Sequence, residues 1–592
     1  MQFIDWLILG LYFLLSLLIG VYYSKKASGS TENFFLSGRN LTWWIAGLSM
    51  VATTFAADTP LAVTELVGKN GIAGNWLWWN MLIGGMLTVF FFSRLWRRAN
   101  ILTDVEFIEL RYSGKAAAFL RGFKGLYLGI FMNTIIMGWV NLAMMKILMG
   151  MFPEYINSGN VIIYVGICML ITAGYSAISG LWGVAVTDAF QFVLAMTGCI
   201  ILAIIVVNQP QIGGIEGLQA KLPPWALKFT PDISSENAAS EYAGAFAITI
   251  STFLAYIGIQ WWAAWYPGAE PGGGGYVAQR MMSAKNEKHS LLATFFFQVA
   301  HYCIRPWPWI IVGLCATILY PNLPMADKGL GYVKAMNDFL PVGLKGLLLA
   351  AFFAAYMSTI STHLNWGTSY FINDFYKRFI IKSKDEKHYV LISRLMTIVF
   401  MFLSVLVTTQ MESISGVWSF VIECGAGLGL VLILRWFWWR VNAISEIAAT
   451  ITPFLVYGFL HFGNKADLFS ISFPHTLFII VPITTLVWII TSFITKPTEE
   501  SKLIEFYKRV HPGGAGWKKI YEKLPEVKSD SNYFFLFIDW FLGIILVYMF
   551  LFGTGKIIFG DYISGFIFII VGLIAGAIIF YDLNKRGWET IR

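Results

Sequence analysis

The sequence predicts an all-α polytopic membrane protein. Of its 592 residues, 57% are hydrophobic and only 13% are charged, whereas soluble proteins carry roughly 25% charged residues. Apolar stretches of about 20 residues, enough to cross a bilayer as a helix, recur fifteen times. The loops between them are alternately rich and poor in Lys and Arg, so the net charge of +8 indicates membrane topology and not nucleic-acid binding.

The first apolar stretch, 3–23, has no small-residue cleavage site and is expected to be retained as a helix. The five cysteines all lie in apolar segments, without zinc-site or disulfide spacing, and are interpreted as buried small side chains. The other fourteen spans are expected at 41–68, 74–96, 119–150, 159–178, 181–208, 243–266, 288–320, 343–376, 388–411, 415–439, 443–462, 474–495, 533–553 and 562–582.

An odd number of spans places the two termini on opposite sides of the membrane. The positive-inside rule predicts an external N-terminus and a cytoplasmic C-terminus in a plasma (bacterial inner) membrane. The long loops 209–242 and 321–342 are then external. The charged linker 499–532 is cytoplasmic and is expected to form an amphipathic helix on the membrane surface. A regulatory partner site is the alternative for this linker, and no obligate protein partner is predicted.

Two spans are interrupted by helix-breaking residues. The span 41–68 contains the run Asp58-Thr59-Pro60 at mid-membrane, and 243–266 runs into a Pro- and Gly-rich stretch. Broken helices at membrane depth are tolerated only where they are buried or line a cavity. The two breaks lie five spans apart and enter from opposite sides, which predicts a five-plus-five inverted repeat. The predicted divisions are a helix and basic loop at 1–40, repeats at 41–208 and 243–440, an external loop at 209–242, extra helices at 441–498, the linker at 499–532 and C-terminal helices at 533–592.

The span 343–376 carries a row of hydroxyl side chains after an apolar run. Because helical residues advance by about 100°, most of this row shares one face with Asn365. Neutral oxygens are suitable ligands for a dehydrated Na⁺. A polar interface between two helices is the other interpretation. The hydroxyl residues are Ser358, Thr359, Ser361 and Thr362.

Four segments of the chain resemble the sodium–solute symporter family, which includes bacterial sugar, proline and sialic-acid carriers. They occur in the family's order and spacing over nearly the whole chain. The resemblance implies the LeuT-type inverted-repeat fold. The segments are SGRNLTWWIAGLSMVAT at 37–53, SGLWGVAVTDAFQ at 179–191, QRMMSAKNEKHS at 279–290 and LAAFFAAYMSTISTHLN at 349–365.

The resemblance also implies ion sites. A first Na⁺ site would combine the carbonyls of Ala52, Phe55 and Ala355 with the hydroxyls of Ser358 and Thr359. The broken span frees carbonyls that a continuous helix would use.

A second Na⁺ site occurs in some members of the family. Here it would use Asp188, Ser361 and Thr362, with Ser358 shared. An ion pair with a Lys or Arg near the inner face is the alternative for Asp188.

The solute site departs from that of the family's sugar carriers. Their acid–Gln pair corresponds to Asp58 and Thr59, their Lys to His301 and their Gln to Glu423, while the Tyr of the inner gate is kept as Tyr276. Two further residues complete the expected set of Asp58, Thr59, Asn80, Tyr276, His301, Arg305 and Glu423.

Arg305 is expected to balance Asp58 or Glu423, or to bind a substrate carboxylate. One or two of the clustered tryptophans are expected in the pocket, where aromatic faces suit sugar rings; the others fit an interfacial belt. These tryptophans are Trp76, Trp78, Trp79, Trp261, Trp262 and Trp265.

The predicted function is Na⁺-coupled import of a small polar solute, a sugar or sugar acid, by alternating access, with the bilayer and the solute as its partners. Amino-acid or monocarboxylate symport is the alternative, and H⁺ coupling through Asp58, Asp188 or Glu423 remains open. A membrane enzyme is not favoured because no His–Glu metal spacing or nucleophile elbow is present. A channel would need a filter, and a sensor would need a signalling domain after the last span.

Overall fold

The computed structural model describes residues 1–592 except 28–29, 232–248, 412–413, 528–532 and 589–592. In this part of the chain the regular elements are helices, with one isolated bridge between Leu41 and Ala284. Eleven helices are long and apolar enough to cross a membrane, and two bent helix pairs raise the number to thirteen. Of the two other expected spans, 159–178 appears as the shorter apolar helix Val161–Gly174. The beginning of 243–266 lies outside the described residues. The prediction of an all-α polytopic protein is confirmed.

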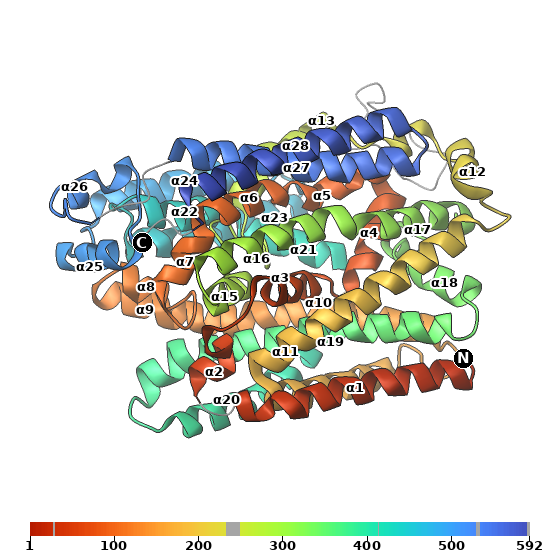
Figure 1. The fold of residues 1–592 in the computed structure, drawn as a ribbon, viewed down its shortest axis with the longest axis horizontal. Coiled ribbons are helices and arrows are strands. Elements are labelled where there is room, and N and C mark those ends of the chain that lie inside the picture. Colours follow the sequence, from red (N-terminus) through yellow and green to blue (C-terminus); the bar gives the residue numbers. More distant parts are fainter. Residues whose placement is uncertain (28–29, 232–248, 412–413, 528–532, 589–592) are drawn as a thin grey trace.

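The N-terminal half of the chain forms a bundle of long helices (Figure 1). α1 lies along the outside of this bundle and contacts α11 and α19. α11 changes direction at Gly180, which adopts a φ of 55°. The elements are α1 (Phe3–Ala27), α2 (Thr31–Leu36), α3 (Trp43–Thr54), α4 (Asp58–Asn70), α5 (Trp76–Trp79), α6 (Met81–Leu87), α7 (Ser93–Ala99), α8 (Phe107–Arg111), α9 (Gly114–Leu126), α10 (Asn133–Met151), α11 (Val161–Val207) and α12 (Gly214–Lys221).

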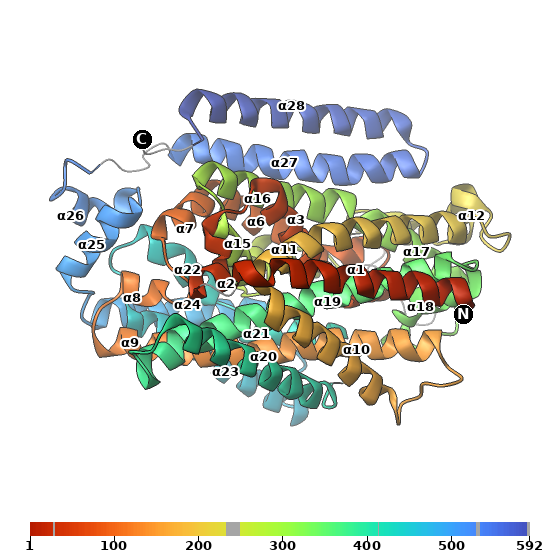
Figure 2. The ribbon, with the colours of Figure 1, turned by 60° about the horizontal axis from the view of Figure 1, so that its bottom comes forward.

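The C-terminal half continues the bundle and adds a helix pair beside it. α27 and α28 pack on each other and lie along one side of the molecule (Figure 2). The elements are α13 (Ile250–Ala255), α14 (Trp261–Ala263), α15 (Gly275–Ser283), α16 (Glu287–Val299), α17 (Pro306–Leu319), α18 (Leu330–Phe339), α19 (Leu344–Tyr370), α20 (Glu386–Thr408), α21 (Ile414–Cys424), α22 (Leu428–Phe437), α23 (Ala443–Lys465), α24 (Leu477–Ile494), α25 (Glu500–Val510), α26 (Lys518–Tyr521), α27 (Tyr533–Ile558) and α28 (Tyr562–Arg586).

Both predicted helix breaks are present. α3 and α4 meet at 56°, and three residues separate them. Pro60 lies in the first turn of α4, where its missing N–H costs no helix hydrogen bond. After α14, residues 264–274 are not helical, and Gly268, Gly272 and Gly273 adopt positive φ values. Glycine tolerates this conformation because it lacks a Cβ.

A third break lies within 415–439, for which the sequence predicts one continuous span. α21 and α22 are bent by 47°, and Gly427 between them has a φ of 91°. The backbone here bonds to the backbone of the other break: Trp265 N donates to Gly425 O at 3.2 Å, and Gly427 N donates to Ala263 O at 2.9 Å. The interruption is therefore stabilised by tertiary contact, which a search for helix-breaking residues in one span does not detect.

The basic loops gather at one end of the molecule. α7, α8, α25 and the end of α28 lie at this end, and α12, α18 and the N-terminus lie at the other (Figures 1 and 2). This arrangement agrees with the alternation of basic loops in the sequence.

The linker helix α25 packs on the protein rather than presenting its apolar face to a membrane. Leu503 and Phe506 are buried, and α25 contacts α7 and α8. Trp517, which follows α25, donates its indole N–H to Trp436 O at 2.7 Å, and its ring lies 4.8 Å from the Arg111 guanidinium. The sequence predicts that the apolar face of this linker lies on the membrane surface. In the structure the protein itself covers the apolar face of α25.

Candidate functional site

A cavity of about 90 Å³ lies where the breaks of α3–α4 and α14–α15 meet. Thr54, Asp58 and Thr59 come from the first break, and Tyr266, Gly268 and Tyr276 from the second. His301, Tyr302 and Arg305 reach it from the junction before α17, and Trp78, Trp139 and Trp418 supply aromatic walls. The cavity therefore combines hydrogen-bonding groups with flat apolar faces.

Five of the seven expected solute residues line this cavity: Asp58, Thr59, Tyr276, His301 and Arg305. The other two do not line it. The Asn80 amide donates to the carbonyls of Trp76 and Leu77 in its own helix, at 2.7 and 3.0 Å.

Glu423 lies outside the cavity because it faces a different helix. Its carboxylate accepts a hydrogen bond from the Thr476 hydroxyl at 2.5 Å, while the neighbouring Ile422 lines the cavity. Successive residues of a helix point about 100° apart, which explains why the neighbour and not Glu423 reaches the solute side. Glu423 also makes no ion pair with Arg305, one of the two pairings expected from the sequence.

Arg305 is fully buried and holds the end of α3. Its Nη2 donates to Thr54 O at 2.8 Å, and its Nη1 donates to the Thr54 hydroxyl at 2.7 Å. Among the described residues no carboxylate lies within ion-pair distance of this guanidinium, although Asp58 lines the same cavity. One Asp58 oxygen, Oδ1, is buried without a hydrogen-bond partner in the described chain.

The contact between Arg305 and His301 fixes the imidazole tautomer. Nη1 of Arg305 lies 2.6 Å from Nδ1 of His301. A guanidinium can only donate, so Nδ1 accepts and the neutral ring carries its hydrogen on Nε2. His301 therefore offers an N–H donor to a solute in the cavity.

Trp78 forms the aromatic wall beside His301. Its ring is stacked on Tyr302 at 5.6 Å and meets the His301 ring edge-on at 5.5 Å. Trp78 is the member of the clustered tryptophans that lines this cavity, while Trp265 lines a second cavity next to Glu270. One tryptophan of the cluster in the pocket agrees with the sequence-based expectation.

Tyr276 closes against the glycine of the second break. A Cβ placed at Gly268 would lie 1.9 Å from the Tyr276 hydroxyl oxygen, so the phenol occupies space that only glycine leaves free. Gly268 has a φ of 84°, which also favours glycine.

The residues expected at the first Na⁺ site lie where α3 contacts α19. Ala52 and Phe55 are at the end of α3, and Ala355 lies one turn before the hydroxyl pair on α19. The Thr359 hydroxyl donates to Thr53 O at 2.8 Å, and the Ser358 hydroxyl donates to Asp188 at 2.7 Å. A hydroxyl that donates its hydrogen keeps two lone pairs, so both side chains can still coordinate a cation.

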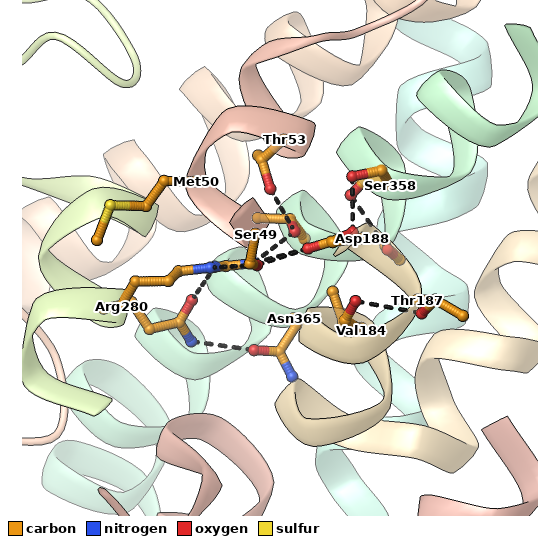
Figure 3. Close-up of polar contacts among 12 residues, drawn as sticks. Ser49, Met50, Thr53, Val184, Thr187, Asp188, Arg280, Ser358 and Asn365 are labelled. Atoms are coloured by element: carbon orange, nitrogen blue, oxygen red, sulfur yellow. Dashed lines mark hydrogen bonds and ion pairs between the residues drawn. The ribbon is translucent and has the colours of Figure 1, made fainter. Parts of the chain in front are cut away.

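A buried polar network surrounds Asp188 (Figure 3). Asp188 accepts hydrogen bonds from Ser49 and Ser358 at 2.5 and 2.7 Å, and lies 3.8 Å from the Arg280 guanidinium. Arg280 in turn donates to the hydroxyls of Ser49 and Thr362 at 3.1 and 2.7 Å. The alternative considered for Asp188, an ion pair with a basic residue, is therefore present in this conformation.

Three residues of the expected second Na⁺ site belong to this network: Asp188, Ser358 and Thr362. Ser361 does not join through its hydroxyl, which bonds to Ser358 O of its own helix at 3.2 Å. Because Arg280 already balances the Asp188 carboxylate, a Na⁺ ion at this second site would have to compete with the Arg280 guanidinium.

Comparisons with known proteins agree with this architecture. The family model described as the sodium:solute symporter family matches residues 34–452. The chain belongs to the sodium:solute symporter family. It is a multi-pass membrane transporter that uses Na⁺ as its coupling ion, and it is not an enzyme.

The most similar relatives include cotransporters of sugars and polyols. The chain is 24% identical to the sodium/mannose cotransporter SLC5A10 of Bos taurus, over 74% of this chain and 75% of the relative. It is 25% identical to the sodium/glucose cotransporter of Vibrio parahaemolyticus, over 77% and 85%, and 25% identical to the sodium/myo-inositol cotransporter 2 of Oryctolagus cuniculus, over 74% and 67%.

A solved structure of a Na⁺-coupled sialic acid symporter, in a substrate-bound outward-open state, has a similar fold. The TM-score is 0.64 at 21% identity, covering 84% of this chain and 99% of that chain. The similarity confirms the LeuT-type inverted-repeat fold predicted for the symporter.

The sequence alone does not single out several residues of the candidate site. Ser49 lies one turn before Thr53 on α3, so the spacing of four could have placed both on one helix face. Arg280 lies in the segment 279–290, but its pairing with Asp188 depends on contact between distant helices. Tyr266 and Trp139 carry no local signal, because their place in the cavity depends on packing between distant helices.

Proposed function

We propose that the symporter imports a neutral sugar or related polyol together with Na⁺. The observation that carries the proposal is the cavity between the two helix breaks, which Asp58, His301 and Trp78 all line. Hydroxyl groups of a sugar can donate to a carboxylate and accept from His301 Nε2–H, while Trp78 covers an apolar ring face. The sugar and polyol cotransporters among the relatives support the same class of solute.

Arg305 makes a sugar acid the second candidate. A guanidinium has five N–H donors, and three are used by Thr54 and His301. Its Nε is buried without a partner in the described chain, which leaves part of the group for a carboxylate. The neutral sugar ranks first because most of the Arg305 donors are already bonded to Thr54 and His301.

For ion coupling, we infer a first Na⁺ site at Ala52, Phe55, Ala355, Ser358 and Thr359. One Na⁺ carried with a neutral solute moves one charge, which at 100 mV contributes about 2.3 kcal/mol, or roughly fiftyfold accumulation. A second Na⁺ at Asp188, Ser361 and Thr362 would require Arg280 to withdraw, and would double that energy. The ratio of charge to solute moved distinguishes one ion from two.

The proposed topology has an external N-terminus and a cytoplasmic C-terminus in the plasma membrane. The gathering of basic loops beside α25 supports it. Alternating access would then open the cavity outward for loading, and Tyr276 would have to leave Gly268 for release on the inside.

The testing experiment is uptake by reconstituted liposomes under an inward Na⁺ gradient. The panel contains neutral hexoses and inositol, matched uronic acids, amino acids and short monocarboxylates. Uptake of a hexose or inositol that needs Na⁺ and rises with an inside-negative potential is expected. Selective uptake of a uronic acid or amino acid would replace the proposed solute, and equal uptake in choline would contradict Na⁺ coupling.

A further inference from the structure

The end of α3 leaves backbone carbonyls that a continuous helix would have bonded. The last four carbonyls of any helix lack partners within it, and in this case the helix ends inside the membrane-spanning bundle. Val51 O and Ala52 O accept from the N–H of Phe55, and Thr53 O accepts from the Thr359 hydroxyl. Thr54 O is satisfied by a charged group.

That charged group is Arg305, which comes from the junction before α17 in the other half of the bundle. Besides its bonds of 2.8 and 2.7 Å to Thr54, it approaches Val51 O at 3.5 Å. The guanidinium also lies over the rings of Phe55 and Trp309, at 5.6 and 5.1 Å. Two aromatic faces, two carbonyls, one hydroxyl and the Nδ1 of His301 therefore surround the cation.

This environment suits a cation without a carboxylate partner. A helix C-terminus carries about half a negative charge, and this charge acts more strongly where water is absent. Aromatic faces attract cations as well. No carboxylate in the described chain lies within ion-pair distance of Arg305, so these groups balance its charge together with the longer-range attraction of Asp58 in the same cavity.

We propose that Arg305 is a resident cation at the break between α3 and α4: its tethered guanidinium fills a position at which the carbonyls would otherwise attract a mobile cation, and it thereby positions the first Na⁺ site. The inference rests on the Na⁺ site of the proposed function. Arg305 is a positioning residue for that site. Arg305 acts through Thr54. The adjacent residue, Thr53, has the carbonyl that accepts the hydrogen bond from Thr359.

The same contacts link solute and ion. His301 lines the solute cavity and accepts a hydrogen bond from Arg305, which holds Thr54. Thr53 then contacts Thr359 at the Na⁺ site. A solute that moves His301 therefore changes the geometry of the Na⁺ ligands through three hydrogen bonds and one peptide bond, which lead from the junction before α17 through α3 to α19.

The test measures Na⁺ binding directly, with ²²Na⁺ and purified full-length protein in the absence of solute. Arg305→Ala is expected to raise the Na⁺ concentration for half-saturation by at least about tenfold. Millimolar guanidinium chloride should restore Na⁺ binding in this variant, because the free ion can occupy the vacated position. Arg305→Lys keeps the charge but not the forked bonds, and should give an intermediate value.

Arg378→Ala is the matched control. Arg378 is a partly exposed arginine paired with Glu109, so its removal should leave Na⁺ binding unchanged, with or without guanidinium. Unchanged Na⁺ affinity in folded Arg305→Ala, or a loss of affinity that guanidinium does not repair, would overturn the proposal.

If Arg305→Ala does not fold, ²²Na⁺ binding by Arg305→Lys and Thr54→Val tests the proposal instead. Thr54→Val removes the hydroxyl bonded to Arg305 but keeps the carbonyl, and both variants should weaken Na⁺ binding; wild-type affinity in both would overturn the inference. Failure of the proposed function is recognised separately, as the absence of any Na⁺ binding by the wild-type protein.

Discussion

The two helix breaks that meet at the cavity have different chemistry. The break between α3 and α4 spans three residues, and its carbonyls are bonded by Thr359 and Arg305. The break between α14 and α15 runs over residues 264–274, is rich in glycine, and places Gly268 against Tyr276. The first break is short and held by polar side chains of other helices, whereas the second depends on glycine conformations and close backbone packing.

This difference indicates a division of tasks between the two breaks. The first presents oxygen atoms at a fixed spacing, which a cation site needs. The second joins the backbone of the third break through Trp265 and Gly427, and leaves a tyrosine resting on a glycine. We therefore expect ion binding to depend on the first break and movement of solute to depend on the second.

The largest effect is expected from Thr359→Val. The change keeps the shape of the side chain but removes the hydroxyl that bonds Thr53 O and would bind Na⁺. The Na⁺ concentration for half-maximal uptake should rise by more than about tenfold, equivalent to about 1.4 kcal/mol. Thr368→Val is the control, because the Thr368 hydroxyl bonds to Leu364 O of its own helix. Equal Na⁺ dependence of uptake in the two variants would contradict the proposal that Thr359 is a ligand of the first Na⁺ site.

Gly268→Ala should come next, with a loss of most solute uptake. The added methyl carbon would lie 1.9 Å from the Tyr276 hydroxyl oxygen, and the alanine would have to adopt an unfavourable positive φ. Measured uptake should fall by roughly tenfold, with a much smaller change in Na⁺ affinity, because the severe clash is with the tyrosine, whereas the side chain of Thr54 lies 3.2 Å from the added Cβ. Gly258→Ala is the control, since a Cβ there meets no atom within 4 Å. Normal uptake by Gly268→Ala would contradict the proposed role of Tyr276 as the inner gate.

Gly425→Ala should have a smaller effect. A Cβ at this position would lie 2.8 Å from Trp265 O and 2.9 Å from Trp265 N, so the backbone contact between the second and third breaks has to loosen. Uptake should fall a few-fold, by about 1 kcal/mol for one weakened hydrogen bond, again without a change in Na⁺ affinity. Gly458→Ala, which meets no neighbouring atom, should behave as wild type. A change in Na⁺ affinity would show that the breaks are not separable.

Trp517→Ala should affect Na⁺ dependence least. The indole is fully buried between the linker and α22, so its loss should lower thermal stability, by about 3 kcal/mol for a large-to-small change. A lower melting temperature in detergent with an unchanged Na⁺ dependence is expected, since the linker lies outside both breaks. Altered Na⁺ dependence would assign the linker a part in the transport cycle.

Much of the fold could be predicted because hydropathy and helix breakers are local signals. The break after Thr54 and the one after Ala263 are both visible as Pro, Gly and polar residues inside apolar spans. The break at Gly425 was not, because its stabilising bonds come from Trp265, far away in the sequence.

The site was predicted in part for the same reason. Asp58 and His301 could be placed by resemblance, whereas Glu423 could not, because a shift of one residue on α21 decides which side chain faces the cavity. The role of Arg305 at Thr54 depends on two helices meeting at a break, which no spacing in one segment encodes.

The most direct test of the division between the breaks is ²²Na⁺ binding without solute, measured beside solute uptake for the wild type, Thr359→Val and Gly268→Ala. We predict that Thr359→Val loses both, and that Gly268→Ala keeps Na⁺ affinity within about twofold, less than 0.5 kcal/mol, while losing uptake. If Gly268→Ala weakens Na⁺ binding as much as Thr359→Val does, the two breaks form one functional unit and the account is contradicted.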